Sequence, residues 1–181
     1  MCNSFNKKFL DEAAKALEQD MDYSLTDHDR FMEQAVEKAI KGVLSDEGGP
    51  FGCVIVKKGQ IVGKGNNKVT STNDPTAHAE VMAIREACKA LNSFQLDDCI
   101  LYTSCEPCPM CLGAIYWARP KKVYYGCTKT DAAKIGFDDN FIYKELDLKP
   151  DKRTIPFEQI NKKEAMRAFR AWEDKDDKIE Y

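Results

Sequence analysis

The chain has 181 residues, which is enough for one domain with a hydrophobic core of its own. It is 43% hydrophobic and 31% charged, typical of a soluble protein, and no apolar run is long enough to span a bilayer. The net charge of −3 argues against a polynucleotide substrate, because proteins that grip nucleic acids usually carry a basic face. Eight cysteines without a secretion signal are expected to be free thiols in a reducing cytoplasm.

The first half of the chain predicts a helix followed by a β-hairpin. Residues 1–25 form an N-terminal extension whose apolar spacing suits a short amphipathic helix. The main domain is expected to span residues 26–181. Its first helix repeats apolar residues from Phe31 to Val43 and stops before Gly48–Gly49. Residues 51–67 then read as two strands joined by a turn at Lys58–Gly59.

The second half alternates strands with helices. His78 heads a helix whose inner face is expected to carry Val81, Ile84, Ala87, Cys88 and Leu91. A buried strand at 99–104 leads into a helix that begins near Cys108, and another strand follows at 121–127. This alternation indicates a layered α/β fold with some parallel strand pairing.

The C-terminal part is predicted to be a hinge followed by a segment with an apolar helix. Residues 146–156 are polar and bounded by prolines, which suits a hinge-like linker. Residues 155–160 read as a short strand. In the segment 157–181, Met166, Phe169 and Trp172 recur on one side of a helix and require a surface on which to be buried.

Three residues have the spacing of metal ligands. Cys108 and Cys111 are three positions apart at the start of a helix, where Pro109 fits the first turn, so their sulfurs can close on one ion. His78 would supply a third ligand, one fewer than a closed structural zinc site needs. A fourth position would therefore be open to water, as in a catalytic zinc site.

Glu80, two residues after His78, fits this interpretation. Zinc lowers the pKa of bound water to about 7, and a nearby carboxylate is still needed to take and return its proton. An H-x-E triplet followed by P-C-x-x-C is the signature of zinc nucleobase deaminases, in which the glutamate is not a ligand. Taken alone, a single histidine on a helix is more often an ordinary polar residue. Cys105 precedes Pro107, so we expect it to lie in the loop before the helix and not to bind metal.

The chain resembles the cytidine-deaminase-like zinc hydrolases, and within them the bacterial guanine deaminases. The resemblance runs from about Thr26 to Tyr181 and leaves the first 25 residues outside it. It rests on the stretches GGPFG, NN at 66–67, DPTAHAEV, CILYTSCEPCPMCLGAIYWARPK, GFDD and the terminal EY. It implies a three-layer α/β/α fold with a mixed central sheet of about five strands, and one zinc ion per chain.

The resemblance also implies the reaction and the roles of individual residues. Guanine and water would give xanthine and ammonia, with Glu80 carrying protons to the ring and to the leaving amine. Asn67 would hydrogen-bond the purine, although it could also be a simple turn residue. Asp139 would contact the amino edge of guanine and assist proton transfer, whereas aspartates such as Asp138 and Asp139 commonly cap helices. Phe51 could stack on the base or belong to the core.

The resemblance further implies a homodimer. The segment 157–181 would cross to the second subunit, and Tyr181 would close the partner's active site, an exchange that the hinge permits. The expected partner is a small purine, with no polynucleotide and no membrane. Two other interpretations stay open. One is a related deaminase that acts on guanosine, on a tRNA adenosine or on cytosine. The other is a zinc-stabilised binding module without activity.

Overall fold

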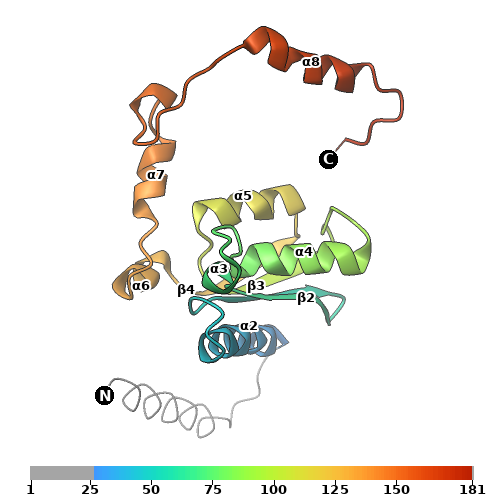
Figure 1. Ribbon diagram of the computed structural model, residues 1–181. Helices are drawn as coiled ribbons and strands as arrows, with labels where there is room; N and C mark the ends of the chain where they lie inside the picture. The colour runs from blue at the N-terminus through green and yellow to red at the C-terminus, as the bar shows by residue number, and fades with distance from the viewer. Residues whose placement is uncertain (1–26, 181) are drawn as a thin grey trace, which may run out of the picture. The chain divides into compact units, whose positions relative to one another are not determined.

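The structure is a computed structural model that describes residues 27–180 (Figure 1). The helix expected in residues 1–25 lies outside the described residues, as does Tyr181. The main compact unit of the chain begins at Phe31, within the first described helix, α2 (Asp27–Leu44). Within residues 27–180, no helix combines the length and apolar character needed to cross a membrane.

A mixed sheet lies at the centre of this unit. Its strands are β1 (Gly52–Lys57), β2 (Gln60–Asn66), β3 (Cys99–Cys105) and β4 (Lys122–Cys127). The spatial order is β2-β1-β3-β4, with β1 antiparallel to both neighbours and β3 parallel to β4. The β1–β2 turn takes positive φ at Lys58 (49°) and Gly59 (76°), as expected for a hairpin whose turn matches the strand twist. The predicted hairpin is thus confirmed.

Helices cover both faces of the sheet. The helices after α2 are α3 (Val69–Thr72), α4 (Ala79–Leu91), α5 (Pro109–Ala118), α6 (Lys129–Lys134), α7 (Asn140–Leu146), the 3-10 turn η1 (Pro150–Lys152) and α8 (Lys162–Glu173). Strand β1 shows the layering directly. Cys53 and Ile55 belong to a core cluster with α4 and α5, whereas Val54 and Val56 pack with α2. Figure 1 shows α2 on one side of the sheet and α4 and α5 on the other. Alternate strand residues point to opposite faces, so β1 is buried on both sides and the three-layer α/β/α architecture is confirmed.

Helix α4 packs against the sheet through small residues. Of the five residues predicted for its inner face, Ala87 is fully buried, whereas Ile84, Cys88 and Leu91 are only partly buried against the core. The other fully buried hydrophobic positions are the small residues Ala79 and Ala83. The reason is the close approach of β2. A Cβ atom on Gly63 or Gly65 would lie 2.5 Å or 2.1 Å from a carbonyl oxygen of α4, so only small residues fit between the two elements.

The C-terminal part differs from the prediction in one element. Residues 155–160 form no strand, and the sheet within residues 27–180 has four strands instead of about five. Apolar alternation does not by itself make a strand, because the backbone groups must pair with a neighbour, and Pro156 lacks an N–H. The predicted helix is present as α8, and it has no buried residue.

Candidate active site

Two helix starts bring the predicted metal ligands together. His78 is the N-cap of α4 and Cys108 is the N-cap of α5, each with an extended backbone (ψ 155° and 168°). Pro109 occupies the first turn of α5, where its missing N–H leaves no hydrogen bond unmade. Because α4 and α5 lie on the same face of the sheet, their N-terminal ends can converge (Figure 1). Cys111 reaches the same point from the first turn of α5.

The three side chains have the separations of a single metal site. The sulfurs of Cys108 and Cys111 each lie 3.5 Å from Nδ1 of His78, and the three atoms all lie within 4.8 Å of one another. Hydrogen bonds from Cys111 and His78 lower the pKa of the Cys108 thiol to about 4. The same contact with Cys108 raises the pKa of His78. The hydrogen bond with Cys108 raises the pKa of the Cys111 thiol, so the site favours the thiolate, the form of cysteine that binds metal, at Cys108.

Cys105 lies apart from this cluster. Its sulfur points toward the carbonyl oxygen of Thr128, 3.6 Å away, and it is not among the three side chains that converge. Burial raises the pKa of the Cys105 thiol to about 11, the opposite direction from Cys108. The position of its sulfur therefore sets Cys105 apart from the three converging side chains.

Glu80 is buried beside the three potential ligands. It is 6% exposed, and its Oε1 accepts a hydrogen bond from Oγ1 of Thr103 at 3.2 Å. Burial raises the pKa of the Glu80 carboxyl, because the charged form loses hydration. A carboxyl whose pKa is raised toward neutrality suits proton transfer in both directions. Sequence reasoning missed Thr103, although this residue lies on β3, the strand that leads into the cysteine motif.

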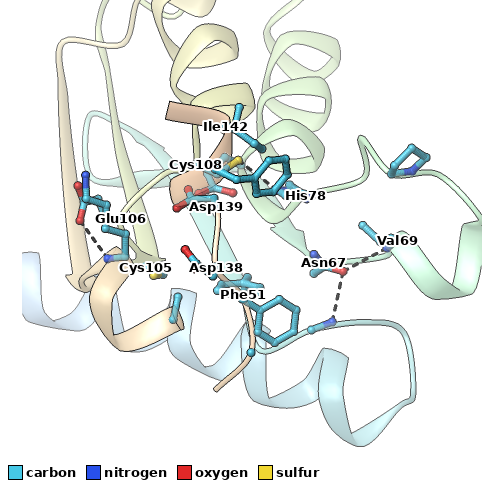
Figure 2. Close-up of a pocket in the computed structure, with 18 of the residues that line it drawn as sticks. Phe51, Asn67, Val69, His78, Cys105, Glu106, Cys108, Asp138, Asp139 and Ile142 are labelled. Carbon is cyan, nitrogen blue, oxygen red and sulfur yellow. Dashed lines mark hydrogen bonds between the residues drawn. The ribbon is translucent and has the colours of Figure 1, made fainter. Parts of the chain in front are cut away.

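A cavity of about 530 Å³ opens beside this cluster (Figure 2). It combines the candidate ligands and Glu80 with residues from the hairpin and from the segment after β4. Its walls include Phe51, Asn67, His78, Glu80, Cys105, Cys108, Phe137, Asp138, Asp139 and Ile142. Such a volume is within the range of small-molecule sites. All the site residues predicted from the sequence line it except Cys111, which is fully buried, and Tyr181, which is outside the described residues.

Asn67 and Phe51 form the hairpin side of the cavity. Asn67 is 5% exposed, and its Oδ1 accepts hydrogen bonds from the backbone N–H groups of Gly49 and Val69, both at 3.2 Å (Figure 2). The ring of Phe51 meets that of Phe137 edge-to-face at 4.9 Å between centroids. Phe137 did not stand out in the sequence, although it is part of the GFDD stretch. The two rings make an apolar wall on which a flat ring could stack.

The two neighbouring aspartates have different surroundings. Oδ1 of Asp138 accepts a hydrogen bond from the backbone N–H of Asn140 at 2.9 Å, at the start of α7. Asp139 makes no such side-chain bond to the helix. Burial raises the pKa of Asp139, and the negative charge of Cys108 acts in the same direction. Figure 2 shows Asp139 beside Cys108 and His78. The carboxylate of Asp138 is thus bound to the start of α7, whereas the carboxylate of Asp139 makes no such bond and can contact a molecule in the cavity.

These features define a class of protein. Residues 25–127 match the family described as the cytidine and deoxycytidylate deaminase zinc-binding region. That stretch covers more than half of the chain, and it includes the hairpin, His78, Glu80 and the two cysteines. The chain therefore belongs to the cytidine and deoxycytidylate deaminase family.

Individual relatives narrow the comparison. The chain is 61% identical to the guanine deaminase of Bacillus subtilis over 154 residues, 85% of this chain and 99% of that protein. The crystal structure of B. subtilis guanine deaminase superposes with a TM-score of 0.83, covering 85% of this chain and 98% of the other. A tRNA-specific adenosine deaminase of Streptococcus pyogenes is 44% identical over 108 residues, 60% of this chain and 67% of that protein. A guanine deaminase structure from Nitrosomonas europaea is 30% identical, with a TM-score of 0.58, and covers 60% of this chain and 63% of the other.

Proposed function

We propose that this protein is a zinc-dependent hydrolase that converts guanine and water into xanthine and ammonia. The observation that carries the proposal is one cavity in which the candidate metal ligands and Glu80 meet a carboxamide from Asn67 and a carboxylate from Asp139. The high identity to B. subtilis guanine deaminase over nearly its whole length supports the same substrate.

The donor set fits zinc. With zinc–nitrogen and zinc–sulfur bonds of about 2.0 and 2.3 Å, two ligands of a tetrahedral ion lie about 3.5 Å apart. This is the distance between His78 Nδ1 and each of the two sulfurs. One imidazole and two thiols are also typical zinc ligands, and three protein ligands leave a position for a small molecule. We therefore propose that His78, Cys108 and Cys111 hold one zinc ion per chain, which supplies Lewis-acid activation of water.

Glu80 is proposed to move the protons. Its carboxylate lies on the first turn of α4, two residues after His78, and it is shielded from bulk water. It would accept a proton from water and deliver it to a ring nitrogen. It would then take the second proton of that water, from the hydroxyl group now attached to the ring carbon, and pass it to the amine, which leaves as ammonia while the carbonyl forms. The hydrogen bond from Thr103 holds one carboxylate oxygen in place, so the other is left for this exchange.

Two polar side chains are proposed to recognise the purine. Asn67 has its Oδ1 committed to two backbone N–H groups, so its Nδ2 amide can donate to an acceptor of the ring. Asp139 can accept from the N–H and NH₂ groups on the amino edge of guanine, and it can assist proton transfer there. Phe51 is proposed to stack on the base. This combination of donor, acceptor and aromatic wall matches guanine better than cytosine, which lacks a ring N–H beside its amino group.

A substrate panel tests the proposal. The zinc-loaded protein is incubated with guanine, guanosine, adenine and cytosine, and ammonia release is followed. Release from guanine is expected. Release from guanosine instead would show that the cavity selects a nucleoside. A tRNA that contains adenosine is added to the panel because the Streptococcus relative is a tRNA-specific adenosine deaminase. No release from any compound, with zinc bound, would favour a binding module over an enzyme.

We also propose a homodimer with exchanged C-terminal segments. Apolar side chains are exposed along the described part of this segment. They include Phe157, Ile160, Phe169, Trp172 and Ile179, which are 42–80% exposed. A surface of this kind is expected to be covered by a partner. In the proposed dimer the end of the segment covers the neighbour's cavity, with Tyr181 contacting the substrate.

All seven cysteines within residues 27–180 are free thiols, which supports a reducing, cytoplasmic location.

A further inference from the structure

The orientation of the Asn67 carboxamide depends on two segments of chain. Its Oδ1 bridges the backbone N–H of Gly49, in the loop after α2, and the N–H of Val69, at the start of α3. Within the described residues no hydrogen bond from its Nδ2 is present, and this group is left for the cavity. If the two segments separated, Oδ1 would lose one donor and the carboxamide could rotate. Something must therefore hold the two segments at a fixed spacing.

Glu47 joins the same two segments through its backbone. Its N–H donates to the carbonyl of Gly42 at 2.9 Å, which anchors it to the end of α2. Its carbonyl oxygen accepts from the other segment, from Oγ1 of Thr70 at 3.2 Å, from Oγ of Ser71 at 2.8 Å and from the N–H of Ser71 at 3.3 Å. Each of these bonds ties the loop that carries Gly49 to the helix that carries Val69.

The side chain of Glu47 adds a second connection. Its Oε2 accepts a hydrogen bond of 2.6 Å from Nδ2 of Asn66, which is 2% exposed, and lies 3.6 Å from Nζ of Lys68. The bond from Asn66, together with the charge of Lys68, lowers the pKa of Glu47 and keeps it ionised. Charge-assisted hydrogen bonds of this length are stronger than neutral ones. Asn66 and Lys68 directly flank Asn67, so the carboxylate holds the backbone on both sides of it.

The absence of a side chain at Gly42 leaves space for the hydrogen bond between Asn66 and Glu47. A Cβ atom on Gly42 would lie 2.6 Å from Nδ2 of Asn66, in the position that this amide needs to reach Glu47. A side chain at position 42 would therefore displace the buried carboxamide of Asn66.

We propose that Glu47, acting through Asn66, is a positioning residue for the reaction: it fixes the carboxamide of Asn67 so that its Nδ2 amide donates into the substrate cavity. The inference rests on the proposed function, because it requires Asn67 to contact the substrate. Glu47 itself is not among the residues that line the cavity, so it acts only through its neighbours.

A double-mutant cycle tests the inference. Glu47→Ala is measured for kcat/KM on guanine in the wild-type background and in an Asn67→Ala background. We expect a loss of about tenfold in the first and less than about twofold in the second, because coupled residues are not additive. Glu47→Gln keeps an oxygen acceptor for Asn66 and is expected to retain most of the activity. Glu37→Ala is the matched control: Glu37 lies on the exposed side of α2, where it accepts a hydrogen bond from Gln34, and its loss should leave kcat/KM unchanged.

Zinc content and Tm are recorded for each variant to detect unfolding. If Glu47→Ala does not fold, Gly42→Ala replaces it, since it favours the helix but displaces Asn66. Its loss of kcat/KM should also disappear in the Asn67→Ala background.

Equal losses in both backgrounds, or no loss in the wild-type background, would overturn the inference. If the wild type releases ammonia only from another compound of the panel, the proposed function fails and the cycle is run on that compound. A folded, zinc-loaded wild type that is inactive on all compounds overturns both.

Discussion

The segment from α2 to β4 and the segment after β4 are built in different ways. Within residues 27–180, every buried hydrophobic residue except Ala132 comes before β4. After β4, large apolar side chains are mostly exposed. They include Phe137, Phe141, Leu146, Ile155, Phe157, Ile160, Phe169 and Trp172. The first segment therefore has its own core, and the second requires another surface to bury its apolar side chains.

The same difference divides the residues of the candidate site into two groups. His78, Glu80 and the two cysteines, which are the proposed metal ligands and proton carrier, lie on or at the start of helices that pack on the core. Asp138 and Asp139 come from the second segment. The family match ends at residue 127 and the tRNA-specific adenosine deaminase aligns over 108 residues, whereas B. subtilis guanine deaminase matches over 154. The family match therefore covers His78, Glu80 and the two cysteines but neither Asp138 nor Asp139.

Loss of the metal is expected to have the largest effect on activity, and it tests the segment from α2 to β4. We expect Cys108→Ala to lose both zinc and activity, because two ligands hold zinc poorly. Cys105→Ala should keep about one zinc per chain, since its sulfur points to Thr128. Metal analysis of the two purified variants measures this. Loss of zinc from the Cys105 variant would mean that a different set of sulfurs binds the ion.

Removing the proton carrier is expected to have the next largest effect. Glu80→Gln should bind zinc and guanine but lose about 10²–10⁴-fold in kcat, the usual contribution of a general acid–base group. The amide keeps the shape of the side chain and can still accept from Thr103. Steady-state kinetics with a guanine-binding assay separate the two properties. Near-normal turnover would exclude Glu80 from the proton transfers.

Substitutions of the two aspartates, Asp138 and Asp139, test the role of the segment after β4. Asp139→Asn should lower kcat/KM on guanine by about 10- to 100-fold, because an amide carries no charge and cannot take a proton. Asp138→Asn should change it by less than about twofold, since the amide oxygen can still accept from the N–H of Asn140. Parallel kinetics on both variants give the comparison. A reversed order would assign the substrate contact to Asp138.

The smallest effect is expected at the end of the chain. Deletion of Glu180 and Tyr181 should lower activity by about three- to tenfold while zinc content and Tm stay unchanged, because a lid excludes water without taking part in bond breaking. Light scattering of the full chain should give the mass of a dimer. A monomer, or full activity after the deletion, would remove the exchanged segment from the site.

The sequence determined the elements and the chemistry that local patterns carry. Apolar periodicity predicted α2 and α8, Lys58–Gly59 predicted the hairpin turn, and the alternation of strands and helices predicted the layers. The H-x-E and P-C-x-x-C motifs predicted a metal site because both lie at helix starts, where spacing along the chain fixes which side chains are neighbours. The structure brings those three ligand side chains within reach of one ion, and their role stays a prediction.

Only the tertiary structure decided features that depend on contacts between distant segments. Residues 155–160 had the pattern of a strand but found no neighbour with which to pair. Small residues line α4 because β2 approaches its backbone closely. Asp138 and Asp139 look equivalent in sequence, and they differ because only Asp138 is hydrogen-bonded to the start of α7. Glu47 carries no motif at all. Its contacts with Asn66 and Ser71 join residues about twenty positions apart, and local spacing cannot encode such contacts because they arise only when the chain has folded.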